Sequence, residues 1–235
     1  SEQGPSWATQ FYLNGRAYTW RAVTRRGYAI QGTDQHRIRV WENGVWRWQR
    51  MDELRAGMTV PLKASGLVGD PQPVPLNCAQ ESDCHPTPVT LPATMSPELA
   101  YLVGFFMGDG SCKARSLRFA VSDPASEAKL SGLIKQLFNA EAKISTDARS
   151  ATLRSVELHS VNVVAFWRNN GFAKELPHAQ HRGKGYRPSI PLAVLRSNDP
   201  AVYGAFLAGL FDADGAAHHA HISWLTTDQS FHDQV

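Results

Sequence analysis

Two segments of the chain are mainly apolar, carry small residues four positions apart, and end in Asp-Gly. They read Leu102-Val-Gly-Phe-Phe-Met-Gly-Asp-Gly110 and Leu207-Ala-Gly-Leu-Phe-Asp-Ala-Asp-Gly215, agree at five of nine positions, and lie 105 residues apart. An internal repeat at this spacing predicts two similar lobes. Because small residues at i and i+4 let helices approach until their backbones touch, we expect paired helices with one carboxylate from each at a shared end.

Both repeats carry the signals of a helix at each end. A capping side chain and a proline precede each one, as Ser96-Pro97 and as Asp199-Pro200, and this order is typical of helix starts. The closing glycine of each repeat stands where a residue in the left-handed conformation would end a helix. The sequence therefore predicts helices over residues 97–109 and 200–214.

The last acids of the repeats, Asp109 and Asp214, would then lie at the negative ends of their helix dipoles. A carboxylate is unfavourable there by about 0.3–1 kcal/mol, and two carboxylates in one tight interface also repel each other. A divalent cation reverses the sign of both effects. Two core helices with incidental glycines are the alternative, but the caps, stops and acids repeat in register, which favours a cation site.

Outside the repeats, the hydrophobic pattern changes between strand and helix periods. Alternation predicts a half-buried strand, and apolar residues three and four apart predict an amphipathic helix. The expected elements are a strand at 117–121, a helix at 125–138, strands at 142–146 and 152–159, a helix at 161–169 ending near Gly171, and a strand at 220–224, after which the chain closes where a helix would begin.

The first sixty residues show short strand patterns. Arg37-Ile-Arg-Val-Trp41 is followed by Asn43-Gly44, a two-residue hairpin signal, and by Val45-Trp-Arg-Trp48. Six aromatic residues lie within about thirty-five residues here. They predict a compact β unit whose aromatic side chains pack together as a core.

Residues 63–94 are rich in proline and glycine and show no periodicity, which predicts a linker or surface excursion. Cys78, Cys84 and His85 fall within this segment. Three soft ligands at irregular spacing are a weak signal for a zinc site. We therefore expect a solvent-exposed loop.

The composition is typical of a folded protein outside the membrane. With 235 residues, 43% of them hydrophobic, the chain can bury a core and hold more than one domain. No segment resembles a signal peptide or a membrane span, and three cysteines provide no disulfide framework, so we expect a cytoplasmic protein. The net charge is only +3, but basic residues exceed acids in 1–62, 113–154 and 174–196, which suits a polyanionic partner.

The repeated motif closely resembles the paired motif of LAGLIDADG homing endonucleases. In that family the two motif helices pack side by side between αββαββα lobes, whose sheets form a saddle over double-stranded DNA. The resemblance implies an α+β fold and two or more Mg²⁺ ions held by Asp109 and Asp214, with the backbone carbonyls of Gly108 and Ala213 as further ligands. Met107 and Gly108 depart from the Asp and Ala usual in the family, but neither is the metal-binding position.

The family also uses a basic residue that polarises the attacking water. Lys184, within Arg182-Gly-Lys-Gly-Tyr-Arg-Pro-Ser-Ile-Pro191, resembles the lysine of the block that precedes the second motif in intein endonucleases. A flexible basic loop that contacts phosphates fits this lysine equally well. Lys113, just past the first motif, is the alternative for the catalytic role.

The resemblance further implies strand faces that meet DNA. We expect basic side chains on the faces opposite the core, and the histidines near the C-terminus to act as contact or surface residues rather than as a metal cluster. The residues are Arg115, Arg118, Arg149 and Arg154 on or near the strands, Arg182 and Arg187 in the basic loop, and His219 and His221 on one strand face beside His218.

Upstream, Thr33-Asp-Gln-His36 resembles the T-x-x-H block of inteins and their hedgehog-type relatives. In that family the Thr and His contact the scissile peptide upstream, and the imidazole drives an N-to-S acyl shift; Thr33 and His36 hold the matching positions. The Asn43-Gly44 hairpin and residues 54–60 add to the resemblance, which is greatest for inteins lodged in ribonucleotide reductases. It implies part of an all-β Hint domain.

The flanking splicing blocks of an intein are not visible. Ser1 is followed by Glu-Gln-Gly rather than by the family's opening strand, and no His-Asn block precedes the end at Val235. Twenty residues follow the second motif, so the second lobe is expected to be incomplete, and splicing by this chain alone is not expected. The expected domains are a partial Hint domain at 1–62, a linker at 63–95, a first endonuclease lobe at 96–196 and the start of a second lobe at 197–235.

Together these features predict an intein-encoded, site-specific homing endonuclease that hydrolyses DNA phosphodiester bonds and is associated with protein splicing. Its partners would be double-stranded DNA, the host protein exteins and a complementary intein fragment, with no membrane. The alternatives are a non-cleaving DNA-binding protein on the same fold, an autoprocessing domain or split fragment with an inactive endonuclease, and an RNA maturase. Non-cleaving relatives typically lose the motif acids, and both are present here; the short second lobe favours reduced activity.

Overall fold

The computed structural model describes residues 10, 12–13, 15–62, 70–80, 88–146, 153–174, 187–217, 219 and 222–235. The chain divides into two compact units, Ser1–Gly66 and Leu67–Val235. It combines α-helices with small antiparallel sheets, in agreement with the expected α+β class. None of the helices in the described part of the chain has the length and apolar character needed to cross a bilayer.

The first unit contains two β-hairpins. β1 (Trp20–Val23) pairs with β2 (Ala29–Gly32), and β3 (Arg37–Glu42) pairs with β4 (Val45–Arg50), both antiparallel. The β3–β4 turn is Asn43-Gly44, with φ angles of 51° and 81°, so the expected two-residue hairpin is confirmed. A short 3₁₀ helix, η1 (Met51–Glu53), follows β4.

The aromatic residues that the structure describes in this unit do not form a core, and that expectation is wrong. The tryptophans of β1, β3 and β4 are 42–58% exposed, and Tyr18 is 98% exposed. The buried apolar side chains in the described part of the unit are Val40 and Met51. Each hairpin is a separate two-stranded sheet, and a two-stranded sheet without a covering layer leaves its side chains open to water.

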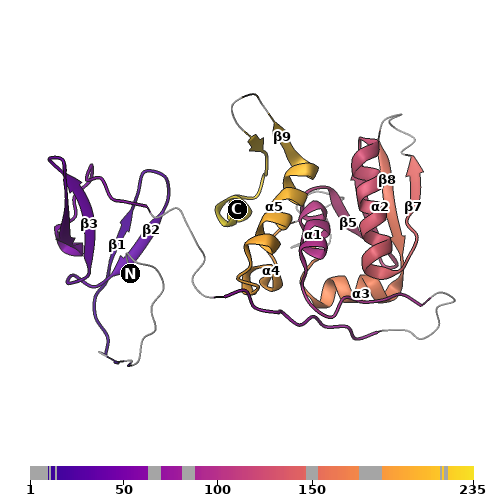
Figure 1. The fold of residues 1–235 in the computed structure, drawn as a ribbon, viewed down its shortest axis with the longest axis horizontal. Coiled ribbons are helices and arrows are strands. Elements are labelled where there is room, and N and C mark those ends of the chain that lie inside the picture. Colours follow the sequence, from indigo (N-terminus) through magenta and orange to yellow (C-terminus); the bar gives the residue numbers. More distant parts are fainter. Residues whose placement is uncertain are drawn as a thin grey trace. The chain divides into compact units, whose positions relative to one another are not determined.

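The second unit opens with elements in the order helix, strand, strand, helix, strand, strand, helix. The strands form one antiparallel sheet in the order β5-β6-β8-β7, and the helices pack against β6 or β8. The sequence predicts each of these elements to within two residues except β5, which is too short to show alternation. They are α1 (Pro97–Asp109), β5 (Gly110–Cys112), β6 (Ser116–Val121), α2 (Pro124–Phe138), β7 (Lys143–Thr146), β8 (Arg154–His159) and α3 (Val161–Asn169) (Figure 1).

An aromatic cluster joins the first repeat helix to the sheet. Phe119 of β6 pairs with Val156 of β8, and both are fully buried. Phe119, Phe106 of α1 and Trp167 of α3 meet edge to face, with ring centroids 5.2–6.4 Å apart. This geometry is favourable for aromatic rings beyond the area that they bury, so α1 is held firmly to its own lobe.

The two repeat helices, α1 and α5 (Pro200–Asp214), lie side by side (Figure 1). A Cβ atom at Gly104 would lie 1.9 Å from the carbonyl oxygen of Phe206, and one at Gly209 would lie 2.0 Å from that of Tyr101. Backbone therefore touches backbone, as the small residues predict. Phe206 follows Tyr101 by the 105 residues that separate the repeats, so the two contacts are related by a pseudo-two-fold axis.

The expected starts of both repeat helices are confirmed. The Ser96 side chain accepts a hydrogen bond from the backbone N–H of Leu99, and the Asp199 carboxylate accepts one from that of Ala201. Each cap satisfies an N–H group that has no partner inside its helix.

The expected left-handed ends of these helices are wrong. Gly110 and Gly215 have φ angles of −90° and −89°, and the chain runs on in extended conformation into β5 and β9 (Gly215–Ala217). Glycine is required there by close approach instead. A Cβ at Gly110 would lie 2.3 Å from the Phe106 ring, and one at Gly215 would lie 2.3 Å from the Phe211 carbonyl oxygen.

The described parts of 63–95 lie on the second unit as a surface excursion rather than as a free linker. Met95 N donates to Val74 O at 3.0 Å, and Thr90 N donates to Phe138 O at 3.0 Å. Residues 70–80 are mostly exposed, as expected of a loop, and Cys78 is half-buried within them, with its Sγ 3.3 Å from the Pro92 carbonyl oxygen. Cys84 and His85 lie outside the described residues.

The C-terminal part of the chain forms further elements beside α5. α4 (Leu192–Arg196) precedes α5, and β9 pairs with β10 (Ile222–Trp224) before a short helix, α6 (Gln229–Gln234). The chain thus closes with a helix rather than before one, because Phe231 is buried against Trp224, with ring centroids 5.4 Å apart. His219 is exposed before β10 rather than on the strand, and His218 and His221 lie outside the described residues.

The backbone contact makes a direct prediction for glycine substitutions in α5. Gly209→Ala should lower the free energy of unfolding by about 2–3 kcal/mol, because its methyl group has to push the helices apart. Gly204→Ala, in the same helix with nothing within 4 Å of the new methyl group, should raise it by about 0.5–1 kcal/mol. Urea unfolding of both variants checks this; equal effects would contradict the helix contact.

Candidate metal centre at the ends of the repeat helices

The last turns of α1 and α5 bring the two motif acids to one end of the helix pair. A Cβ at Gly108 would lie 2.5 Å from the Ala213 Cβ and 3.0 Å from a carboxylate oxygen of Asp214. Asp109, the next residue of α1, interacts electrostatically with Asp214. The structure therefore brings together the four residues for which the sequence predicts a metal site, and metal binding itself stays a prediction.

The structure adds a residue that the sequence analysis does not identify. Lys174 donates a hydrogen bond from its Nζ to the carbonyl oxygen of Gly108. It also interacts electrostatically with the carboxylates of Asp109 and Asp214. A basic side chain thus stands at the candidate site, as expected. Lys184 lies outside the described residues, so its expected role stays a prediction, and Lys113 is exposed after β5.

Lys174 reaches the site because the chain after α3 is anchored. Gly171, with a φ angle of 71°, turns the chain after the helix. Phe172 is then fully buried, with its ring centroid 5.3 Å from that of Trp167. The segment Gly171-Phe-Ala-Lys174 carries the signal for this arrangement: a helix-ending glycine, a buried aromatic residue and a lysine two positions later.

The pKa values of the two aspartates depend on the neighbouring charges and on partial desolvation at the helix ends. Burial and the neighbouring Asp214 carboxylate raise the pKa of Asp109 to about 6, while Lys174 acts in the opposite direction. Burial also raises the pKa of Asp214, again opposed by Lys174. Both aspartates are exposed residues, so their carboxylates remain reachable by a small cation.

The charge on Lys174 is disfavoured by the same surroundings. Desolvation lowers the pKa of its ammonium group, and the two carboxylates act against that shift. The two carboxylates therefore stabilise the charged form of Lys174, which burial alone would destabilise.

The donor set suits a hard divalent cation. Two carboxylates and backbone carbonyls are the oxygen ligands that Mg²⁺ and Ca²⁺ prefer, and the Lys174 ammonium already donates to one of these carbonyls. No group of three His, Cys, Asp or Glu side chains that could hold a metal occurs within the described residues. A bound Mg²⁺ would therefore keep several water molecules, as it usually does in phosphoryl-transfer sites.

A pocket of about 230 Å³ opens beside the acids, between β5 and the end of α3. Its charged side chains are those of Arg168 and Lys174, so it suits an anionic group. Burial raises the pKa of the Cys112 thiol there, and Arg168 acts against that shift. The pocket is lined by Phe106, Gly110, Ser111, Cys112, Arg168, Ala173 and Lys174.

Of the arginines expected to meet DNA, Arg118 lies on the sheet face opposite the core. Its Nε donates to the Ser155 hydroxyl at 2.7 Å and lies 3.8 Å from a Glu157 carboxylate oxygen. Lys143 of β7 pairs with Glu157 and shares this face. The strand register therefore places Arg118 of β6 and Lys143 of β7 on this face, on either side of Glu157 of β8.

Arg154 is placed on the other face, and that expectation is wrong. It pairs with Val121, a core residue of β6, and its Nη1 lies 3.1 Å from a carboxylate oxygen of Glu127 on α2. The strand register turns this side chain toward the helices. Arg115 is exposed in the turn before β6, and Arg187 is exposed before α4; Arg149 and Arg182 lie outside the described residues.

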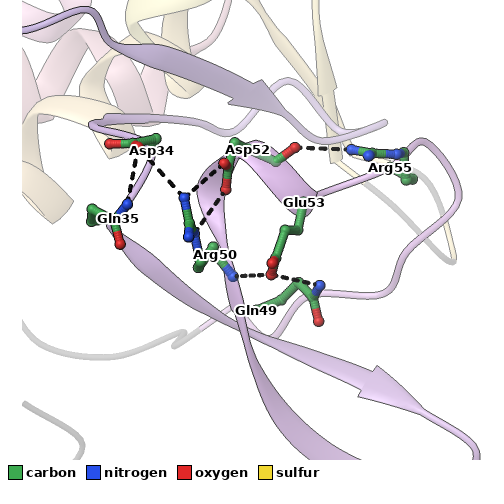
Figure 2. Close-up of polar contacts among 7 residues, drawn as sticks. All are labelled: Asp34, Gln35, Gln49, Arg50, Asp52, Glu53 and Arg55. Carbon is green, nitrogen blue, oxygen red and sulfur yellow. Dashed lines mark hydrogen bonds and ion pairs between the residues drawn. The ribbon is translucent and has the colours of Figure 1, made fainter.

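In the first unit, Thr33 and His36 lie at the two ends of the turn between β2 and β3. His36 N donates to Thr33 O at 3.0 Å, and both residues are exposed. Figure 2 shows Arg50 between two carboxylates, with its Nη2 3.5 Å from Asp34 and 2.9 Å from Asp52. The turn is thereby held to the end of β4 while Thr33 and His36 stay open to solvent.

Two curated proteins resemble the chain over part of their length. A component of the A-type ATP synthase of Pyrococcus abyssi is 25% identical over 217 residues, which cover 88% of this chain and 20% of that protein. The isomerizing glutamine–fructose-6-phosphate aminotransferase of Methanocaldococcus jannaschii is 28% identical over 132 residues, which cover 56% of this chain and 11% of that protein. The chain thus spans a fifth or less of these relatives, and no family profile matches it.

The raised pKa of Asp109 predicts how stability depends on pH in the metal-free protein. Between about pH 4 and pH 6 the unfolded chain loses this proton before the folded one does, so the site lowers the free energy of unfolding as the pH rises. Asp109→Asn removes this effect. The melting temperature of Asp109→Asn in EDTA, minus that of the unaltered chain, should therefore increase from pH 4 to pH 7.

A control for this measurement is Asp233→Asn on α6. Hydrogen bonds, chiefly from Gln229, lower the pKa of this exposed carboxyl, so its substitution should give a small effect of the opposite sign. A pH-independent difference between Asp109→Asn and the unaltered chain would contradict the electrostatic description of the site.

Proposed function

We propose that the chain is part of an intein-encoded LAGLIDADG homing endonuclease that hydrolyses phosphodiester bonds at a specific site in double-stranded DNA. The observation that carries the proposal is the backbone contact between two repeated helices, which end in Asp109 and Asp214 beside Lys174. The αββαββα order from α1 to α3 and the cationic face of the sheet support the saddle arrangement.

The relatives support an inserted element rather than either of their named activities. A component of an ATP synthase and an aminotransferase share no activity by name, yet each matches this chain over a small part of its length. A segment that recurs in proteins of such different function is explained if it is a separate module lodged in a host protein. An intein is such a module, and its DNA and host protein would place it in the cytoplasm.

The reaction needs an in-line water, countercharge for the pentacoordinate transition state, and stabilisation of the leaving 3′ oxygen. Bound Mg²⁺ supplies Lewis-acid stabilisation and lowers the pKa of a coordinated water. Asp109, Asp214 and the carbonyls of Gly108 and Ala213 would hold the ions. Lys174, within reach of the same donors, is placed to orient and polarise the attacking water, the role that the resemblance gives to a basic residue.

The remaining contacts of the site suit a DNA strand. Arg168 in the pocket beside the acids is placed to bind a phosphate next to the scissile one. Arg118 and Lys143 on the sheet face would contact further phosphates or base edges in the major groove. A non-cleaving DNA-binding protein would need only these contacts. The presence of both motif acids and of Lys174 therefore favours cleavage.

The exposed tryptophans of the first unit favour a second role for that unit. Four tryptophans on two hairpins are each at least 42% exposed, which is unusual for a finished β domain. We propose that this unit is part of a Hint domain that is completed by further strands, supplied by the rest of an intein or by a complementary fragment. Thr33 and His36 would then face the peptide bond to be cleaved.

The nuclease proposal predicts that Asp109→Asn and Asp214→Asn each reduce cleavage at least about 100-fold, because each removes a ligand at the reacting centre. DNA binding should remain. The measurement is nicking and cutting of a plasmid that carries the fused, intein-free host sequence, with Mg²⁺ and with EDTA. Asp233→Asn is the matched control and should cut normally; loss of binding in both site variants, with folding preserved, would count against the metal role.

DNA binding should also depend strongly on salt, because the protein releases counterions from the phosphates that it contacts. Arg118→Gln on the sheet face should reduce the slope of log K against log salt by about 1. Arg196→Gln, at an exposed position on α4, is the control and should leave the slope unchanged. An affinity that does not vary with salt would rule out the DNA-binding role.

A further inference from the structure

The Lys174 ammonium group lies against the candidate cation site. This group donates to the Gly108 carbonyl oxygen, which is one of the expected metal ligands. The same ammonium interacts with the carboxylates of Asp109 and Asp214, the two other principal ligands. One oxygen atom expected to bind a divalent cation is thus already contacted by a cation that belongs to the chain, and the same cation offsets the charge of the two carboxylates.

We infer that Lys174 is a displaceable counter-ion of the two motif acids: it neutralises them when no divalent cation is present and leaves the Gly108 carbonyl when one binds. This inference rests on the proposed function and concerns the regulation of its metal site. The affinity for a divalent cation then depends on its competition with the Lys174 ammonium at this site.

The charge balance of the site explains why the lysine has to move. Two carboxylates and one ammonium leave a net charge of −1, which is tolerable near a surface. A divalent cation bound beside the retained ammonium would reverse that sign and place two positive centres on one carbonyl oxygen, where they repel each other at short range. Displacement of Lys174 leaves the carboxylates and the divalent cation balanced.

The adjoining pocket provides a place for the displaced side chain. Lys174 itself lines this pocket of about 230 Å³, and Phe172, fully buried two residues earlier, holds the backbone while the flexible lysine stem turns. Arg168 lines the same pocket and repels a second cation there unless an anion lies between them. A DNA phosphate is such an anion, so cation binding and DNA binding should strengthen each other.

The test compares Lys174→Met with Lys135→Met in the full chain. Methionine keeps a long apolar side chain and removes the charge. Lys135 is an exposed lysine of the same unit that pairs with Glu141 at 2.7 Å, so its substitution controls for the loss of one positive charge. Ca²⁺ is the probe, and its affinity is measured by calorimetric titration of protein freed of metal; melting temperatures are measured in EDTA.

Lys174→Met should bind Ca²⁺ about tenfold or more tightly than the unaltered chain, because it removes the competing charge, while Lys135→Met should match the unaltered chain. In EDTA, Lys174→Met should melt lower by about 3 °C or more. Asp109→Asn in the Lys174→Met background should recover most of that loss, because it removes the repulsion that the lysine had balanced.

Unchanged or weaker Ca²⁺ binding by Lys174→Met would overturn the inference and leave Lys174 as a residue that only positions water. Absence of Ca²⁺ binding in every variant would overturn it together with the proposed metal site. Tighter binding by Lys174→Met in a chain that cuts no DNA would support the counter-ion role and count against the nuclease proposal alone.

Discussion

The backbone contact between α1 and α5 is the constraint on which the second unit depends. Gly104 and Gly209 each sit against a carbonyl oxygen of the opposite helix, where no side chain fits. The contact is repeated about a pseudo-two-fold axis, so the two helices cannot slide without breaking both halves of it. The ends of the helices, and with them Asp109 and Asp214, are therefore positioned by packing that lies one to two turns away.

The side chains around this symmetric contact are not symmetric. The Tyr101 hydroxyl donates to Asp212 at 2.6 Å, and the Lys129 ammonium of α2 lies 3.3 Å from the same carboxylate and 3.7 Å from the Tyr101 ring centroid. The equivalent positions on the other side are Phe206 and Met107, which are buried and apolar. Burial and Asp212 both raise the pKa of Tyr101, which keeps its hydroxyl a donor, so α5 gains a polar tie to α2 on one side alone.

The cost of this architecture is concentrated at the acids. Both carboxylates lie at helix C-termini, where the dipole disfavours them, and burial adds to that by raising both pKa values. The Lys174 ammonium, which lies outside the helix pair, offsets part of this unfavourable free energy. Positive charge relieves the desolvation of both carboxylates, so the site favours a cation.

The repeated helices, their proline and capping starts, the backbone contact and the pairing of the two acids could all be predicted from the sequence. The helix starts depend on a polar residue before proline, which acts within a single turn. The contact between the helices could be predicted because small residues at i and i+4 recur in both copies. Because the pattern occurs twice, each copy also supports the interpretation of the other.

The proximity of Lys174 to Gly108, the face of Arg154 and the exposure of the tryptophans follow from the tertiary structure. Lys174 reaches Gly108 because Phe172 is buried beside Trp167, a contact between residues whose proximity the local pattern does not encode. Arg154 turns toward α2 because of its register with Val121, and a shift of one residue would reverse its face. These outcomes depend on which surfaces meet, and that is set by packing among distant segments rather than by the neighbours of each residue along the chain.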